Sequence, residues 1–401
     1  MSSNKAPIEF NICHLCSFSG RKGGLYGCQW EKDLSAYMEH RKERQVRVIS
    51  VVLRSEDQNY RCRMCCNEKL YFSKGIGDIH SDHFGFSYGT ADIMCPLPEG
   101  CEMPSHITVT NDAPGSDLHK PVYLEVKNQN NKSDALPYNF TVCISTMFNF
   151  TNILQLVQSL EMMQLLGVDR VVIYKSDCSP ETQRVLDYYT KKGLVEVISW
   201  TISKHLKPSH SWKPEYDPGD IHYVGQIPAL TDCVDRYMYQ SRYVSLQDID
   251  ELILPQSVNS WLDLLPQLEK KYGVDKCYIF QNNVFPYTVT LPLPASQKQP
   301  IESPSWKNVP GVNILAHLHQ RPVTRENERD DFKVIVNPRA VFRTSVHGLL
   351  KSENGCAWVD RNIARIYHTS DRTTMPASRG APLWRFPTCH CSVYGGFKLC
   401  R

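Results

Sequence analysis

The sequence predicts an α/β domain built on a doubly wound parallel sheet, preceded by a small disulfide-rich β-sandwich domain. Three observations predict this fold class. Strand and helix patterns alternate after residue 140, short strands separated by turn residues fill the first 126 residues, and cysteines crowd the first quarter of the chain. We expect the β-sandwich domain over residues 1–127, a polar linker over 128–137 and the α/β domain over 138–401.

The composition is that of a globular protein large enough for two hydrophobic cores. Of the 401 residues, 41% are hydrophobic and 22% are charged, and the formal net charge is +3. Basic and acidic residues are mixed along the chain, which gives no case for nucleic-acid binding. The 16 cysteines indicate an oxidising compartment. The chain shows neither the apolar core of a signal peptide nor an apolar run of membrane-spanning length.

The first domain has the pattern of short strands held by disulfides. Its strands are expected at residues 46–53, 60–65, 106–110 and 121–126, separated by glycine, proline and Asn-Asp turns. Two pairs of cysteines have zinc-like local spacing, Cys13 with Cys16 and Cys62 with Cys65, but the pairs lie far apart in sequence. That separation favours disulfides over a zinc site. Aromatic residues such as Phe84, Phe86 and Tyr88 could stack on a sugar ring, and a carbohydrate-binding role is left open.

The α/β domain begins with three strands joined by two helices, which implies a parallel sheet. Such sheets bind ligands at the carboxyl ends of their strands. Thr151 or Asn152 is expected to cap the first helix, and Ser179 caps the second. The predicted strands are 141–145, 170–174, 194–198, 276–285 and 333–342, and the predicted helices are 153–166, 180–192, 225–238 and 260–271.

The paired acids of Asp248-Ile-Asp250 follow a buried strand that starts at Arg242. On an extended backbone, side chains two residues apart project to the same side, so the two carboxylates converge. Convergent carboxylates repel each other unless a divalent cation lies between them, and oxygen ligands suit Mg²⁺ or Mn²⁺. Two histidines downstream, His347 and His368, each follow β-favouring residues, and either could complete the metal site.

Residues from about 138 to 372 resemble glycosyltransferase family 92. The resemblance is carried in order by Phe140-Thr-Val-Cys-Ile-Ser145, Leu166-Gly-Val-Asp-Arg-Val-Val-Ile-Tyr174, Gly225-Gln226, Asp232-Cys233, Arg242-Tyr-Val-Ser-Leu-Gln-Asp-Ile-Asp-Glu251, Lys333-Val-Ile-Val and Val346-His347. The strands near the N-terminus resemble the accessory part of vertebrate members. The resemblance implies a GT-A type nucleotide-sugar-binding domain and an inverting transfer of galactose from UDP-galactose, in β-1,4 linkage, to galactose or fucose on a glycan. It also implies a type II membrane protein of the Golgi. We therefore expect a lumenal chain whose anchor is missing from this sequence, or a secreted one.

The resemblance assigns roles to named residues. Mn²⁺ or Mg²⁺ would be held by Asp248, Asp250 and His347. The UDP-sugar would be contacted by Thr146, Asp177, Gln226, Asp232, Arg236, Asp248, Lys333 and His368. Inversion needs a carboxylate base, and the residues that could serve are Glu251, Glu302, Asp330 and Asp331; Glu251 is expected to face the other side of its strand. The expected partners are UDP-galactose and a glycan acceptor on a glycoprotein or glycolipid, with a homodimer left open.

Two other functions stay open at this point. The chain could be an inactive, lectin-like glycan-binding protein on the same fold, although the intact acid pair argues against this. It could also be a UDP-sugar hydrolase or a nucleotidyltransferase. UDP release with and without glycan acceptors separates these alternatives.

Overall fold

The computed structural model describes residues 32–55, 59–111, 122–131, 135–288, 308–317, 320–322, 331–370, 391–394 and 397–400. These residues form two compact units. The barrel unit contains the described residues of Met1–Pro137, Thr201–Ser241 and Arg343–Val346. The sheet unit contains those of Tyr138–Trp200, Arg242–Phe342 and His347–Arg401. One division between the units falls after Pro137, and two later segments, Thr201–Ser241 and Arg343–Val346, group with the barrel unit.

The barrel unit is built on a closed barrel of seven strands in the order β1-β2-β5-β4-β3-β6-β7. Its strands are β1 (Lys32–Glu39), β2 (Gln45–Leu53), β3 (Asn59–Cys66), β4 (Lys69–Ile79), β5 (Tyr88–Pro96), β6 (His106–Asn111) and β7 (Leu124–Lys127). The predicted β-sandwich is therefore wrong. The sequence pattern locates strands but not their edge partners, and it missed β1, whose antiparallel pairing with β2 and parallel pairing with β7 close the barrel.

Apolar side chains and two disulfides fill the barrel. Its core includes Val48, Met64 and Ile93, all fully buried. Disulfides join Cys62 to Cys95 and Cys66 to Cys101, which confirms the predicted staples at these four positions. Cys65 is buried. The other cysteines of the predicted framework, Cys13, Cys16 and Cys28, lie outside the described residues.

The sheet unit is built on a seven-stranded mixed sheet in the order β10-β9-β8-β11-β15-β13-β18. In chain order the strands are β8 (Tyr138–Met147), β9 (Arg170–Lys175), β10 (Val195–Ser199), β11 (Ser241–Gln247), β13 (Cys277–Phe280), β15 (Lys333–Val336) and β18 (Cys356–Trp358). Strands β8, β9 and β10 are parallel, as predicted. Strand β15 runs antiparallel to both β11 and β13.

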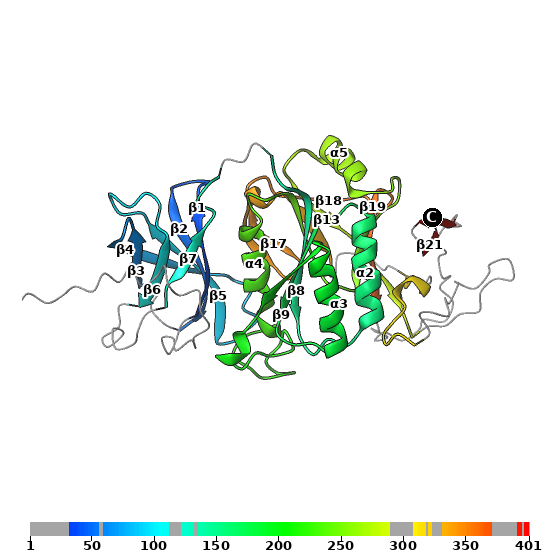
Figure 1. Ribbon diagram of the computed structural model, residues 1–401, viewed down its shortest axis with the longest axis horizontal. Helices are drawn as coiled ribbons and strands as arrows, with labels where there is room; N and C mark the ends of the chain where they lie inside the picture. The colour runs from blue at the N-terminus through cyan, green and yellow to red at the C-terminus, as the bar shows by residue number, and fades with distance from the viewer. Residues whose placement is uncertain are drawn as a thin grey trace, which may run out of the picture. The chain divides into compact units, whose positions relative to one another are not determined.

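Capped amphipathic helices contribute to the core of this sheet. They are α2 (Ile153–Leu165), α3 (Pro180–Lys191) and α5 (Trp261–Tyr272). The side chains of Asn152, Ser179 and Ser260 accept hydrogen bonds from backbone N–H groups of the first turns. Helices α2 and α3 pack against each other (Figure 1), and Leu160 and Leu186 bury their side chains in the same core as strands β8 and β9.

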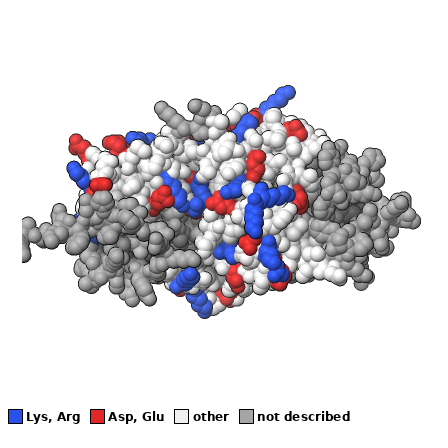
Figure 2. Space-filling model, in the orientation of Figure 1, with Lys and Arg blue, Asp and Glu red and all other residues white. Residues whose placement is uncertain are grey.

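Smaller sheets complete the described chain. Strands β12 (Glu251–Pro255), β19 (Ala364–Ser370) and β14 (Asn282–Pro286) form a three-stranded sheet in the order β12-β19-β14. Strand β16 (Val341–Ser345) pairs with β17 (Gly348–Ser352), and β20 (Cys391–Tyr394) pairs with β21 (Phe397–Cys400). None of the described helices is long and apolar enough to span a membrane. On the face shown in Figure 2, basic and acidic side chains are interspersed among the coloured residues.

Candidate active site

The paired acids lie in a turn between two buried strands. Strand β11 ends at Gln247, residues 249 and 250 form the turn, and β12 begins at Glu251. The backbone N–H of Glu251 donates to the carbonyl oxygen of Asp248 at 3.2 Å, which closes the turn. The alternation of side chains along a strand therefore does not continue from β11 into β12. The turn carries the acids to the edge of the core, where the side chains of Asp248 and Asp250 are 35% and 32% exposed.

Asp248 is held from two other strands. Ser145 on β8 donates its hydroxyl to Oδ1 at 2.7 Å, and the Lys333 ammonium at the start of β15 lies 2.7 Å from Oδ2. The register of β8 shifts between Ile144 and Thr146, and such an irregularity commonly redirects side chains beside active sites. Burial raises the pKa of Asp248, but the Lys333 charge and hydrogen bond outweigh it and hold the pKa at about 2. Asp248 is thus a firmly ionised carboxylate.

Glu251 belongs to the same cluster. The prediction that Glu251 faces the other side of its strand is wrong, because the turn interrupts the alternation of side chains. Its Oε2 accepts from the backbone N–H of Asp248 at 3.0 Å and lies 3.3 Å from the Lys333 ammonium. The Glu251 side chain is only 3% exposed, and burial raises its pKa to about 7 against the opposing charge of Lys333. Glu251 therefore stabilises the turn from its buried side.

His368 lies beside the second acid. It is the register partner of Glu251 in the β12–β19 pair, and its Nε2 lies 3.5 Å from a carboxylate oxygen of Asp250. The backbone N–H of Thr369 donates to the Asp250 carbonyl at 3.1 Å, which fixes the strand against the turn. Burial lowers the pKa of His368, but the hydrogen bond with Asp250 and the negative charges of Glu251 and Asp250 outweigh burial and raise it.

The structure places His347 in the turn between β16 and β17, with its Nε2 3.4 Å from a carboxylate oxygen of Asp331. Its charge also contributes to the low pKa of Asp248, after the larger contributions of Lys333 and Ser145. The two predicted imidazoles thus lie against different acids. Of the residues named as possible bases, Asp331 is partly exposed and Glu251 is buried, while Glu302 and Asp330 lie outside the described residues.

The donors around the turn fit a divalent cation in kind, because ionised carboxylates with a neighbouring imidazole suit Mn²⁺ or Mg²⁺. They are Asp248, Asp250 and the adjacent His368. No three His, Cys, Asp or Glu side chains in the described part of the chain are grouped closely enough to hold an ion. Both carboxylate oxygens of Asp248 are engaged by Ser145 and Lys333, so Lys333 competes with a cation for this acid.

The other residues predicted to contact the UDP-sugar lie in two separate parts of the chain. Thr146 lies at the carboxyl-terminal end of β8, and its hydroxyl is buried without a partner in the described chain. Asp177 follows the end of β9 and is exposed. Gln226, Asp232 and Arg236 lie on α4 (Gln226–Arg236), which belongs to the barrel unit and packs on β1 and β2.

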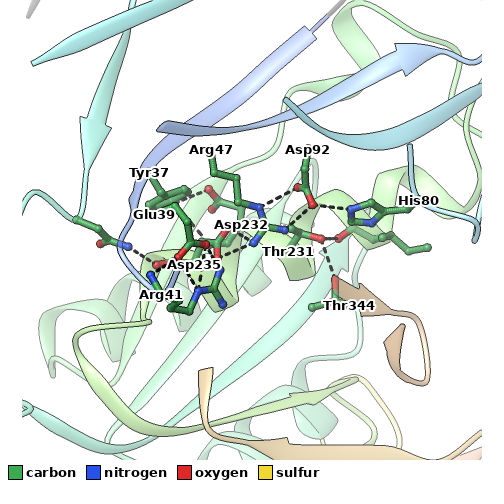
Figure 3. Close-up of polar contacts among 12 residues, drawn as sticks. Tyr37, Glu39, Arg41, Arg47, His80, Asp92, Thr231, Asp232, Asp235 and Thr344 are labelled. Carbon is green, nitrogen blue, oxygen red and sulfur yellow. Dashed lines mark hydrogen bonds and ion pairs between the residues drawn. The ribbon is translucent and has the colours of Figure 1, made fainter. Parts of the chain in front are cut away.

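Helix α4 is tied to the barrel by a buried network of charges (Figure 3). Asp232 accepts from the Tyr37 hydroxyl at 2.6 Å and from Arg236 at 2.9 Å. The guanidinium of Arg47 donates two hydrogen bonds to Asp92 and lies 3.1 Å from Asp235. The polar face of α4 is thus paired with barrel side chains. The expected donor contacts of Gln226, Asp232 and Arg236 stay predictions.

Two neighbours of the site were missed by the sequence analysis. Ser145 contacts Asp248, and Asn282 on β14 lies 3.3 Å from Nδ1 of His368. A signal for Asn282 was available, because Gln281-Asn282-Asn283 interrupts an apolar strand pattern with three amides, all of them buried. Buried polar groups need partners, and a run of three predicts a polar site.

Comparison with known proteins identifies the family of this chain. A family model described as glycosyltransferase family 92 matches residues 138–378, and the chain belongs to this family. It is 26% identical over 250 residues to a glycosyltransferase family 92 protein of Caenorhabditis elegans, covering 62% of this chain and 42% of that protein. It is 22% identical over 169 residues to the beta-1,4-galactosyltransferase galt-1 of the same organism, covering 41% of this chain and 37% of that protein. The chain thus matches less than half the length of these relatives.

Among solved structures, a likeness is found to glucosyl-3-phosphoglycerate synthase from Mycobacterium tuberculosis in complex with Mn²⁺, UDP and glucosyl-3-phosphoglycerate. The TM-score is 0.21 at 14% identity, over 37% of this chain and 44% of that one. At this score the likeness carries no argument.

Proposed function

We propose that the chain is a metal-dependent, inverting glycosyltransferase of GT-A type that moves galactose from UDP-galactose in β-1,4 linkage to a terminal galactose or fucose of a glycan. The observation that carries the proposal is the convergence of Asp248, Asp250, Lys333 and His368 at one turn, inside the region that matches the family. A relative named as a beta-1,4-galactosyltransferase supports the choice of galactose. The cysteine content supports an oxidising compartment such as the Golgi lumen.

The residues at the turn have two different roles in this proposal, metal binding and positioning of the turn. Asp248 and Asp250, with an imidazole beside them, would hold Mn²⁺ or Mg²⁺, which supplies Lewis-acid stabilisation of the departing diphosphate when bound. Glu251 and Lys333 hold the turn in place. Glu251 accepts from the backbone N–H of Asp248, and the Lys333 ammonium lies between the carboxylates of Asp248 and Glu251. Their burial keeps water out of the inner side of the cluster.

The acceptor hydroxyl must lose a proton as the new bond forms. The base has to be a carboxylate within hydrogen-bond reach of that hydroxyl. Among the described carboxylates named for this role, Asp331 is partly exposed, and His347 lies 3.4 Å from it and can orient it. Glu251 is enclosed and already engaged with Lys333. We therefore assign the proton transfer to Asp331.

A donor and acceptor screen tests the proposal. The chain is incubated with Mn²⁺ and UDP-galactose, UDP-glucose or UDP-N-acetylglucosamine, each with and without glycans that end in galactose or fucose. The expected result is UDP release that requires both UDP-galactose and a glycan, with a β-1,4-linked product by linkage analysis. Glycan binding without UDP release would instead show a lectin. UDP release indifferent to the glycan would show a hydrolase.

A further inference from the structure

Two free thiols lie side by side at one edge of the seven-stranded sheet. Cys277 begins β13 and Cys356 begins β18, and they are register partners in this parallel pair. Strand β18 is the last strand in the sheet order. Neither cysteine is in a disulfide. They are far from the barrel disulfides in sequence, and the proposed transferase chemistry makes no use of them.

The strand pairing brings the Cα atoms of the two cysteines into the range that a disulfide can span. Neighbouring strands lie about 4.8 Å apart, and side chains of register partners project from the same face of the sheet. Disulfides join residues whose Cα atoms are about 4.4–6.8 Å apart. The pairing of β13 with β18 therefore meets the distance requirement without backbone movement. The two thiols lie close enough for each to shift the pKa of the other.

The two thiols are chemically unequal. Cys277 is 3% exposed, whereas Cys356 is exposed. Their shared hydrogen bond lowers the pKa of Cys356 and, together with burial, raises that of Cys277; the Ser352 hydroxyl and the Lys276 charge lower the pKa of Cys356 further. The thiolate is the nucleophile in thiol–disulfide exchange, so the accessible Cys356 reacts first.

We propose that Cys277 and Cys356 form a disulfide site, oxidised by exchange with a small-molecule disulfide such as oxidised glutathione. The Cys356 thiolate attacks one sulfur of that disulfide, its S–S bond breaks, and one thiolate leaves. Cys277 then gives its proton to solvent and attacks the Cys356 sulfur, which releases the second thiolate. The net change is one protein disulfide formed and one small-molecule disulfide reduced to two thiols.

The bond would fasten the C-terminal strands of the sheet unit. Strand β18 precedes β19, which carries His368, and β13 precedes β14, which carries Asn282. A Cys277–Cys356 disulfide closes one covalent loop from β13 to β18, which contains β14, whereas β19 follows directly after that loop. Cys178 provides a matched control, because it is a partly exposed free thiol that donates to the amide oxygen of Gln183.

Differential alkylation of the full chain tests the site. The reduced protein is treated with oxidised glutathione, unfolded, alkylated and digested for mass spectrometry. The expected result is a linked Cys277–Cys356 peptide pair, with Cys178 recovered as alkylated thiol or as its glutathione adduct. Oxidation should also raise the Tm of the wild type by more than that of Cys277→Ser, in which the barrel disulfides re-form but the Cys277–Cys356 bond cannot. Recovery of Cys277 as an alkylated thiol after full oxidation would overturn the proposal.

Two single variants fix the order of the steps and keep the test valid if one variant folds poorly. Cys277→Ser should accumulate Cys356 as a stable glutathione adduct. Cys356→Ser should leave Cys277 as a free thiol, because burial shields it from the reagent. The Cys178→Ser variant should form the linked pair as the wild type does. A glutathione adduct at Cys277 in Cys356→Ser would contradict the assignment of Cys356 as the attacking thiol.

Discussion

The chain contains two clusters of carboxylates around a buried cation, one in each unit, and they differ in exposure. In the barrel unit, Arg47 is 5% exposed between Asp92 at 7% and Asp235 at 2%. In the sheet unit, Lys333 is equally buried at 2%, but the acids Asp248 and Asp250 are about a third exposed. The barrel cluster thus encloses its charges, whereas the sheet cluster presents its acids to solvent.

This difference in exposure distinguishes a cluster that stabilises the fold from a cluster whose acids can bind a cation or a substrate. A buried ion pair costs desolvation of both partners and is destabilised strongly when one partner is lost. A half-exposed carboxylate costs little and remains accessible to a cation or substrate. The comparison therefore predicts that the barrel cluster governs stability and the sheet cluster governs activity. The variants below test that division.

The largest effect is expected at Asp250. Asp250→Asn removes an accessible charge at the proposed metal site, so glycosyl transfer should fall by roughly 10³-fold. The Tm should stay near that of the wild type, because the side chain is a third exposed. Asp187→Asn on α3, an exposed acid outside the cluster, serves as the control and should keep full activity. Near-normal transfer by Asp250→Asn would remove Asp250 from the site.

The barrel cluster should respond in the opposite way. Arg47→Met leaves Asp92 and Asp235 buried without their guanidinium partner, and the free energy of unfolding of the barrel should drop by about 3–5 kcal/mol. Arg44→Met is the matched control, since Arg44 forms an exposed pair with Glu102 and should cost less than about 1 kcal/mol. Urea denaturation followed by tryptophan fluorescence measures both variants. Equal losses would show that burial does not distinguish these pairs.

Asp235 gives the barrel cluster a dependence on pH. Burial raises its pKa to about 6, from about 3.9 in an unfolded chain. A raised carboxyl pKa stabilises the fold below the unfolded value, and that contribution is lost as pH rises through the folded value. Relative to Asp235→Asn, the wild type should lose at most roughly 3 kcal/mol between pH of about 4 and 6. Thermal unfolding of both proteins across this range measures the loss. A wild type that gains stability relative to Asp235→Asn as pH rises would contradict the assignment.

The sequence predicted the elements better than their connections. The cap at Ser179, the cap expected at Thr151 or Asn152 and found at Asn152, and the parallel order of β8, β9 and β10 follow from local pattern. The barrel could not be predicted, because its closure depends on the pairing of β1 with β7 across most of the first domain. Long-range pairing is not encoded in periodicity.

In the candidate site too, local sequence pattern predicts some features, whereas others depend on contacts formed only in the folded chain. The acids at Asp248 and Asp250 could be identified from their spacing and the preceding strand. The inward position of Glu251 could not, because one turn hydrogen bond decides it. The polar face of α4 illustrates a further limit. The pattern marks Asp232 and Arg236 as polar, but their pairing with Tyr37 and with each other arises only in the folded barrel.

Lys333 is expected to contribute both to stability and to activity, because it is buried and also contacts an acid of the proposed metal site. Lys333→Met should lower activity and also cost about 2 kcal/mol of stability, because Glu251 would stay buried without its cation. The double variant Lys333→Met, Glu251→Gln removes that uncompensated charge and should recover most of the stability but not the activity. Parallel measurement of Tm and UDP release separates the two effects. Recovery of activity in the double variant would exclude a direct role for Lys333.

The smallest effect concerns the two histidines. The sequence assigns the metal to His347, whereas the structure places His368 at 3.5 Å from Asp250 and His347 at 3.4 Å from Asp331. From these distances we expect His368→Ala to raise the Mn²⁺ concentration for half-maximal activity by about 10-fold, since an imidazole that binds or orients a ligand typically contributes this much. His347→Ala should lower kcat at an unchanged Mn²⁺ requirement, because it orients the proposed base Asp331. Manganese titrations of UDP release for both variants decide the assignment. If His347→Ala alone shifts the titration, His347 is the ligand and the base must be sought elsewhere.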